Sequence, residues 1–400
     1  MHSHPAPFLP DSVYACEHRT PPQVLAAPSR YIQGDGVLAD LGRYVAMINS
    51  RHAAVLISAG GRKRDGARIE QGLRAAGISC LFVTFGGECS LEEIARGSSA
   101  VQTAGIKVDS LIAVGGGKCI DAGKCIAYRL GVAMVSCPSL ASNDAPCSAV
   151  SVIYTPQGVT EALEFFPANP VLVVVDTRIV AEAPVRYLVA GMGDAMATWY
   201  EARTCFENPA ARNMLAARPT LAAAALGELC AKTLFEHGVA AVEAVRARTV
   251  SDALNHVVEA NTLLSGVGFE SGGLAGAHAV AQGLTVLPRL HANYLHGEMV
   301  ALGLMTQLVL EKRDDEAARM AEFLCAVGLP CHLGQLSLDA SHSADLAAVM
   351  AGTTILPFLA NEPFAVDADL LLAATLLADA VGRKAAARIG DAPYRALHGG

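Results

Sequence analysis

Short apolar runs alternate with amphipathic segments along the first half of the chain, from about residue 31 to residue 180. Near-continuous apolar strands separated by helices are typical of a parallel sheet that is covered on both faces. The pattern therefore predicts an α/β domain over 31–180. Two of the runs, 148–154 and 160–166, are joined by Thr-Pro-Gln-Gly, which predicts a hairpin added to that sheet. The strands are predicted at 53–59, 80–85, 110–114, 132–137, 148–154 and 171–176, and helices at 65–76 and 90–104.

The strand signal disappears after about residue 181, and segments rich in Ala and Leu with helical spacing follow. Gly and Pro residues separate these segments, as expected at helix ends. The pattern predicts an all-helical domain over 181–400. Residues 1–30 carry several prolines and little periodicity, so we expect a flexible arm outside the core. The helical segments are predicted at 209–236, 239–265, 274–286, 296–311, 314–327, 343–351 and 367–389.

Composition narrows the classes of protein to which the chain can belong. Of its 400 residues 52% are hydrophobic and 17% are charged, which excludes a disordered protein. The 30 Lys and Arg against 38 Asp and Glu give a net charge of −8, which argues against nucleic acid or an anionic membrane surface as partner. We expect neither a membrane-spanning segment nor a secretory signal. The 11 cysteines are scattered without a CxxC pair, which favours a reducing cytoplasm.

A glycine-rich turn follows one predicted strand and opens a helix. Strand 110–114 runs directly into the segment Gly115–Lys118. Glycines let the backbone approach a ligand closely, and the N-terminus of the following helix favours an anion. A second polar loop, 138–146, follows strand 132–137. Because ligands of open α/β sheets bind at the carboxyl ends of the strands, we expect both loops to face one crevice. This placement favours a dinucleotide site over ordinary tight turns.

Three candidate metal ligands stand out in the helical half: Asp194, His278 and His296. Each is flanked by small or apolar residues, so we expect each to point inward from a helix. A buried charge without a partner is costly, and one cation would satisfy a carboxylate and two imidazoles together. Three protein ligands with an open position are typical of a catalytic zinc site. The alternative is that each is a hydrogen-bonded core residue or a helix cap, because the three lie far apart in the sequence.

Taken together, these segments resemble the glycerol dehydrogenases of the metal-dependent (iron-containing) alcohol dehydrogenase superfamily over roughly residues 30–390. The resemblance rests on the blocks RYIQGDGVLADLG, FGGECS, AVGGGKCIDAGK, SLASNDAPCSAVSVIY, NPVLVVVDTRIVAEAPVRYLVAGMGDAMATWYEAR, AHAVAQGLTVL and LHGEMVALG, in that order. Several such blocks in sequence are far more specific than any one of them. The family fold, an α/β dinucleotide-binding domain followed by a helical domain, agrees with the pattern above.

The resemblance implies a role for each residue that matches a family motif. It implies NAD or NADP as cofactor, a divalent metal, a small alcohol or carbonyl as substrate, and a homo-oligomer. Asp144 matches the carboxylate that meets the substrate near the metal, so the implied catalytic residues are Asp144, Asp194 and His278. The implied metal ligands are Asp194, His278 and His296, and the implied cofactor-binding residues are Gly115, Gly116, Gly117, Lys118, Asp121, Ser139, Ser142, Ser148, Val150 and Tyr154.

Two departures from the family pattern bear on the metal and the cofactor. Iron-dependent relatives carry a histidine one helical turn after the metal-binding aspartate, where this chain has Thr198, which favours three ligands and zinc over iron and leaves another divalent metal open. NAD-using members have an acidic residue near the end of the first strand, where this chain has Ser58–Arg64. The basic residues of that segment either bind the 2′-phosphate of NADP or form a solvated loop, and we expect Gly60 there to contact the cofactor.

These features predict a zinc-dependent enzyme that interconverts a small polyol or vicinal diol and its hydroxyketone or aldehyde. The metal would lower the pKa of the bound alcohol, and a nicotinamide would accept the hydride. One alternative is a lyase resembling 3-dehydroquinate synthase, although the blocks around His278 and His296 offer little basic character beyond Arg289. The other is a non-catalytic dinucleotide-binding protein, which would not need an open coordination position.

Overall fold

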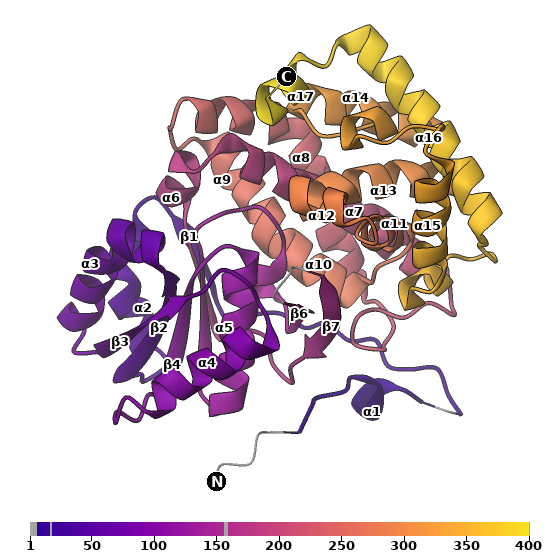
Figure 1. Ribbon diagram of the computed structural model, residues 1–400. Coiled ribbons are helices and arrows are strands. Elements are labelled where there is room, and N and C mark those ends of the chain that lie inside the picture. The colour runs from indigo at the N-terminus through magenta and orange to yellow at the C-terminus, as the bar shows by residue number, and fades with distance from the viewer. Residues whose placement is uncertain (1–5, 17, 156–158, 400) are drawn as a thin grey trace.

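The computed structural model describes residues 6–16, 18–155 and 159–399 (Figure 1). Six parallel strands form the main sheet in the order β1-β8-β5-β4-β2-β3. The predicted α/β class is confirmed, and the short β1 is an addition, because its four residues show no apolar run. The strands are β1 (Tyr31–Gly34), β2 (His52–Ser58), β3 (Ser79–Phe85), β4 (Ser110–Gly115), β5 (Ala133–Pro138) and β8 (Leu172–Asp176).

Helices cover both faces of this sheet. Alternate residues of a strand point to opposite faces, so Leu56 of β2 packs in the core under α4 and α5, while Val55 and Ile57 pack in the core under α2 and α3. All three side chains are buried. This burial on both faces explains why the strands read as near-continuous apolar runs. The covering helices are α2 (Leu41–Ala46), α3 (Ala59–Ala75), α4 (Leu91–Gln102) and α5 (Gly117–Leu130).

The predicted hairpin forms, but the expectation that it joins the main sheet is wrong. Strands β6 (Val150–Tyr154) and β7 (Thr160–Phe165) pair antiparallel in a two-stranded sheet of their own. The backbone of β6 instead forms hydrogen bonds with side chains of α5. The Lys124 ammonium donates to the Val150 carbonyl, and the Asp121 carboxylate accepts from the Val152 N–H. The centre of the turn, residues 156–158, lies outside the described residues.

The second half of the described chain is helical, as predicted, with differences at the helix ends. The prediction of a helix at 209–236 is wrong at its start, because Pro219 precedes α8, which begins after the cap residue Thr220. Helix α8 then continues through Gly238. The predicted 239–265 segment is therefore not one helix: it contains the last residues of α8, all of α9 and the first residue of α10. The helices are α6 (Thr177–Glu182), α7 (Val185–Glu207), α8 (Leu221–Arg246), α9 (Asp252–Glu259), α10 (Ser265–Gly272), α11 (Gly276–Leu284), α12 (Pro288–Asn293), α13 (His296–Leu310), α14 (Asp314–Val327), α15 (Ser343–Thr354), α16 (Ala368–Ile389) and α17 (Ala392–His398).

Part of the N-terminal segment lies on the helical half. The Val24 N–H donates to the Arg218 carbonyl, and the Ala26 N–H donates to Ser271 Oγ. The short α1 (Asp11–Tyr14) lies further out along this segment (Figure 1). Flexibility of residues 1–30 and the domain boundary at 180 stay predictions. Within the described residues, none of the helices combines the length and apolar character that crossing a bilayer requires.

Candidate active site

Three helices bring the predicted metal ligands together. Asp194 lies in the middle of α7, His278 in the first turn of α11, and His296 at the first residue of α13. Helices α7 and α13 approach closely because each carries a glycine beside its ligand. A Cβ at Gly193 would overlap the carbonyl oxygen of Gly297, and a Cβ at Gly297 would overlap the backbone of α7. The small residues that flank the ligands therefore permit the contact.

The geometry of these three side chains fits a cation. Nε2 of His278 and Nε2 of His296 each lie 3.3 Å from Oδ1 of Asp194, and one ligand atom from each residue lies within 4.8 Å of the others. Oδ1 of Asp194 is buried and has no hydrogen-bond partner in the part of the chain that the structure describes. Two ring nitrogens thus converge on one orphaned carboxylate oxygen. One carboxylate and two imidazoles are a donor set that suits zinc with an open coordination position.

Buried charges shift the pKa values of this cluster in opposite directions. Burial raises the pKa of Asp194, but the neighbouring His296 and His278 outweigh burial and hold that pKa below its ordinary value. Burial lowers the pKa of His278, yet Glu201 and Asp194 bring it well above its ordinary value. Such a group of perturbed, mutually compensating ionisable residues beside a cavity is typical of functional sites.

Glu201 is a site residue that the sequence reasoning did not identify. It is fully buried on α7, and its Oε2 lies 2.5 Å from Nδ1 of His278. Its Oε1 accepts the backbone N–H groups of Ala275 and His278, so one carboxylate holds both the ring and the backbone of that residue. A carboxylate on the second nitrogen of a ligating histidine fixes the tautomer and the ring orientation. The signal was present, because Glu201 lies seven residues after Asp194, two helical turns along the same face.

Asp144 lies beside the cluster and is held by a chain of hydroxyl groups. Ser265 Oγ donates to Oδ2 of Asp144 at 2.9 Å, and Thr198 Oγ1 lies 2.9 Å from Ser265 Oγ. The Asp144 N–H donates to Oδ2 of Asp194 at 3.3 Å. Burial and the Asp194 carboxylate raise the pKa of Asp144 well above its ordinary value. Thr198, the departure from the iron-dependent pattern, therefore lies at the end of this hydroxyl chain and outside the three-ligand cluster.

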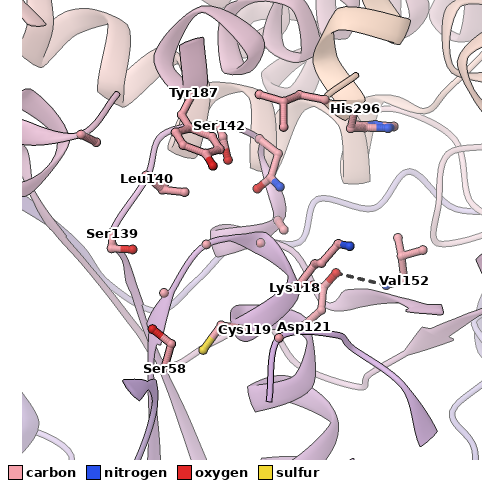
Figure 2. A pocket seen from close by; sticks show the side chains of 18 of the residues that line it. Ser58, Lys118, Cys119, Asp121, Ser139, Leu140, Ser142, Val152, Tyr187 and His296 are labelled. Carbon is pink, nitrogen blue, oxygen red and sulfur yellow. Dashed lines mark hydrogen bonds between the residues drawn. The ribbon is translucent and has the colours of Figure 1, made fainter. Parts of the chain in front are cut away.

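Both predicted loops line one cavity of about 720 Å³ (Figure 2). The loops touch each other, because the Ser139 N–H donates to the Gly115 carbonyl at 2.9 Å, and a Cβ at Gly117 would overlap the Asn143 side chain. His296 lines the cavity, whereas Asp194 and His278 lie buried behind it. The predicted residues that line it are Gly115, Gly116, Gly117, Lys118, Asp121, Ser139, Ser142, Asp144, Tyr154 and His296.

Three of the predicted cofactor-binding residues do not line the cavity. Ser148 Oγ and the Val150 carbonyl both accept from the buried Lys124 ammonium, at 3.2 and 2.6 Å, so they lie behind the cavity wall. Gly60 is exposed in the first turn of α3 and does not line the cavity. Val152, the neighbour of Val150 along β6, does line it, and its N–H bonds Asp121 (Figure 2). The roles implied for Ser148, Val150 and Gly60 stay predictions.

Comparisons with known proteins agree with this architecture. A family model described as "Iron-containing alcohol dehydrogenase" matches residues 28–177. A glycerol dehydrogenase of Escherichia coli is 43% identical over 371 residues, 90% of this chain and 98% of that protein. A glycolaldehyde reductase of Halobacterium salinarum is 40% identical over 90% of this chain and 98% of that protein. The crystal structure of a glycerol dehydrogenase from Schizosaccharomyces pombe matches with a TM-score of 0.86 and 31% identity, covering 92% of this chain and 93% of that one. The resemblance is confirmed: the chain belongs to the iron-containing alcohol dehydrogenase family, among the glycerol dehydrogenases.

Proposed function

We propose that this enzyme interconverts a small polyol or vicinal diol and its hydroxyketone or aldehyde, with NAD or NADP as redox partner and zinc as metal. One observation carries the proposal: Asp194, His278 and His296 converge at the wall of the same cavity that the glycine loop lines. The relatives described above are a dehydrogenase and a reductase of small hydroxylated compounds, so they support this reaction class and give no support to a lyase or a non-catalytic binding protein.

The proposed metal ligands are Asp194, His278 and His296. When bound there, zinc would supply Lewis acidity that favours loss of the alcohol proton, and the nicotinamide would accept the hydride. Thr198 supports zinc over iron, because its hydroxyl bonds Ser265 and so a fourth protein ligand is not offered at that position. Glu201 would keep Nδ1 of His278 protonated and Nε2 turned toward the metal position.

Asp144 is proposed to orient the substrate. Ser265 holds Oδ2 of the Asp144 carboxylate, which leaves Oδ1 to accept a hydrogen bond from a second substrate hydroxyl. A monoalcohol lacks that hydroxyl and would leave a buried polar group unpaired, which disfavours it. The proposed specificity for vicinal diols therefore depends on this carboxylate.

The glycine loop is proposed to hold the cofactor pyrophosphate. Residues Gly115–Gly117 bring backbone N–H groups to the cavity at the start of α5, where the helix dipole favours negative charge. The ammonium of Lys118 lies 2.6 Å from Glu88 and 5.1 Å from the ring centre of Tyr154, so it stands at the cavity wall. The nicotinamide ring would then lie toward His296.

A cytoplasmic homo-oligomer completes the proposal. All 11 cysteines are free, as expected in a reducing compartment. The oligomer is supported by the family resemblance, and light scattering on the purified protein would measure its mass.

The experiment is a matrix of NAD and NADP against small polyols and their carbonyl products, run before and after chelation. We expect turnover with 1,2-diols that disappears on chelation and returns with zinc. Asp144→Asn is the paired variant, and we expect it to lower kcat/KM for 1,2-propanediol much more than for 1-propanol. Undiminished turnover after complete removal of metal would contradict the proposal.

A further inference from the structure

The end of the cavity farthest from the metal cluster lacks the acidic residue that dinucleotide-binding folds use to select NAD. Strand β2 lies next to β4, the strand that carries the glycine loop, and it ends at Ser58. In related dinucleotide folds a carboxylate in this region binds the ribose 2′-hydroxyl. Here Ser58 caps α3 instead, because its Oγ accepts the Gly61 N–H at 3.1 Å. Figure 2 shows Ser58 on the opposite side of the pocket from His296.

The carboxylates that line the cavity belong to other strands. Asp121 follows β4, Asp144 follows β5, and Glu182 follows β8, which lies on the far side of β5 from β2. Among the described lining residues, those that follow β2 are Ser58, Gly61 and Arg64. This end of the cavity therefore offers a hydroxyl, backbone N–H groups and a guanidinium.

Arg64 is the basic residue placed to meet a ligand here. Residues Arg62 to Arg64 are not the solvated loop that was one of the two expectations, because they lie in α3. Helical side chains lean toward the N-terminus, so Arg64 covers the first turn of α3 beside Ser58. Arg62 instead stacks on Phe82, with 4.4 Å between the guanidinium carbon and the ring centre. Lys63 is exposed and does not line the cavity.

Asp65 holds the Arg64 side chain in place without cancelling its charge. Nε of Arg64 donates to Oδ2 of Asp65 at 2.8 Å, while Nη2 of Arg68 donates to Oδ1 at 2.6 Å. Asp65 is buried, so its single charge is shared between two guanidinium groups. The Arg64 side chain is half-exposed, and because it bonds Asp65 through Nε, its Nη1 and Nη2 groups are left to bind an anion.

We infer that this end of the cavity binds the 2′-phosphate of NADP(H), with Arg64 as the residue that selects it. The inference rests on the proposed dinucleotide site. A phosphate dianion here meets a tethered guanidinium and the N-terminal turn of α3, and it meets no carboxylate from β2. NAD(H) would find a hydroxyl in place of the carboxylate that usually binds its ribose. The enzyme therefore prefers NADP(H).

Cofactor binding measured without turnover tests this inference. The dissociation constants of NADPH and NADH are measured by quenching of protein fluorescence, with the native protein and with Arg64→Gln. We expect NADPH to bind the native protein at least about tenfold more tightly, since a charge-assisted hydrogen bond contributes this much or more. Arg64→Gln should remove most of that preference by weakening NADPH alone. Lys63→Gln, a neighbouring exposed position on the same helix, is the matched control and should leave the ratio unchanged.

A second variant restores the missing carboxylate. Asp is as good a helix cap as Ser, so Ser58→Asp should keep α3 intact while repelling the 2′-phosphate. We expect NADPH to weaken at least about tenfold relative to NADH, with Ser58→Asn as the neutral cap control. Equal or tighter binding of NADH by the native protein, or equal weakening of both cofactors in Arg64→Gln, would overturn the inference and leave the proposed function standing. Binding of neither dinucleotide would overturn both.

Discussion

At the metal cluster every described side chain is held by a buried partner, whereas at the glycine loop the same cavity is bounded mostly by backbone. Glu201 fixes His278, and Ser265 fixes Asp144, and all four side chains are buried. The glycine loop is set by a strand, a helix start and one backbone bond to Ser139. The reacting end of the site is thus a network of side chains from distant segments, and the cofactor end is a local turn.

Because of this difference, single substitutions should have larger effects at the metal cluster than at the glycine loop. Removing a member of the side-chain network leaves a buried partner unsatisfied, which is expensive. The glycine loop presents N–H groups that no side-chain truncation removes. We therefore expect variants of the metal cluster to lose metal and turnover while they retain cofactor binding.

Asp194→Ala should produce the largest loss. It removes the oxygen on which both imidazoles converge, so we expect loss of stoichiometric zinc and a fall in kcat/KM of about a thousandfold or more. Metal is counted by mass spectrometry, and NADPH binding is measured on the same sample. An equally large loss of NADPH binding in this variant would contradict the expectation that the metal cluster and the cofactor site are independent.

Glu201→Gln should weaken the metal without removing it. An amide has one acceptor oxygen, so it cannot accept both the Nδ1–H of His278 and the backbone N–H groups that Glu201 accepts, and it carries no charge. We therefore expect zinc affinity to fall about 10- to 100-fold, measured by competition with a chelator. Glu362→Gln is the matched control, because Glu362 is also buried and accepts the Gly276 N–H of the same helix without contacting His278. Equal losses in the two variants would mean that α11 is merely destabilised.

Ser265→Ala should change substrate preference more than metal content. Without the Ser265 hydroxyl, Oδ2 of Asp144 loses its donor, and we expect the preference for 1,2-propanediol over 1-propanol to fall about tenfold. Zinc content should stay unchanged. Ser98→Ala is the control for removing a buried hydroxyl, because Ser98 is a buried serine of α4 whose hydroxyl bonds the Ile94 carbonyl of the same helix. A proportional loss with both alcohols would show that Asp144 does not discriminate between them.

Glu362 should make stability depend on pH with little effect on turnover. Burial raises the pKa of Glu362 to about 8, and the nearby carboxylates of Glu311 and Glu201 add to this, against Arg313. The folded-state pKa lies above the unfolded value, so the stabilisation is complete below the unfolded pKa and is lost as pH rises through 8. We expect the free energy of unfolding to fall by about 1 kcal/mol between pH 7 and pH 8 through this group. Urea titrations at pH 7 and pH 8 measure this fall in the native protein and in Glu362→Gln, and we expect it to be smaller in the variant by that amount. An equal pH dependence of the unfolding free energy in both proteins would contradict the assignment to Glu362.

Local sequence accounts for the turn at the cofactor end of the site but not for the convergence of side chains at the reacting end, for a physical reason. The turn at Gly115–Lys118 and the strand before it are adjacent in the chain, so periodicity and glycine content suffice to place them. Asp194, His278 and His296 approach each other only because α7 and α13 pack through small residues, and no local pattern encodes that packing. Their residue types and flanking residues suggested one metal site, but preferring that site over three separate core residues or helix caps depended on the family resemblance.

The misplaced elements share a related cause. The hairpin of β6 and β7 is separate from the main sheet, and Lys124 and Asp121 of α5 bind its backbone. Hydrophobic periodicity does not predict such a contact between distant segments. Glu201 was not predicted as a site residue, because a single charged residue in an apolar helix is expected at the surface unless its buried partner is known. Ser265 was hidden in the same way, since a serine in a helix gives no sign of what it bonds.

Locating a bound metal ion would show whether Asp194, His278 and His296 form one site. Crystals grown with zinc are measured on both sides of the zinc absorption edge, so that the anomalous signal locates the ion. We expect one strong peak about 2.0–2.2 Å from a carboxylate oxygen of Asp194 and from Nε2 of both His278 and His296. A fully occupied zinc peak elsewhere, with these three side chains bonded only to one another, would contradict it.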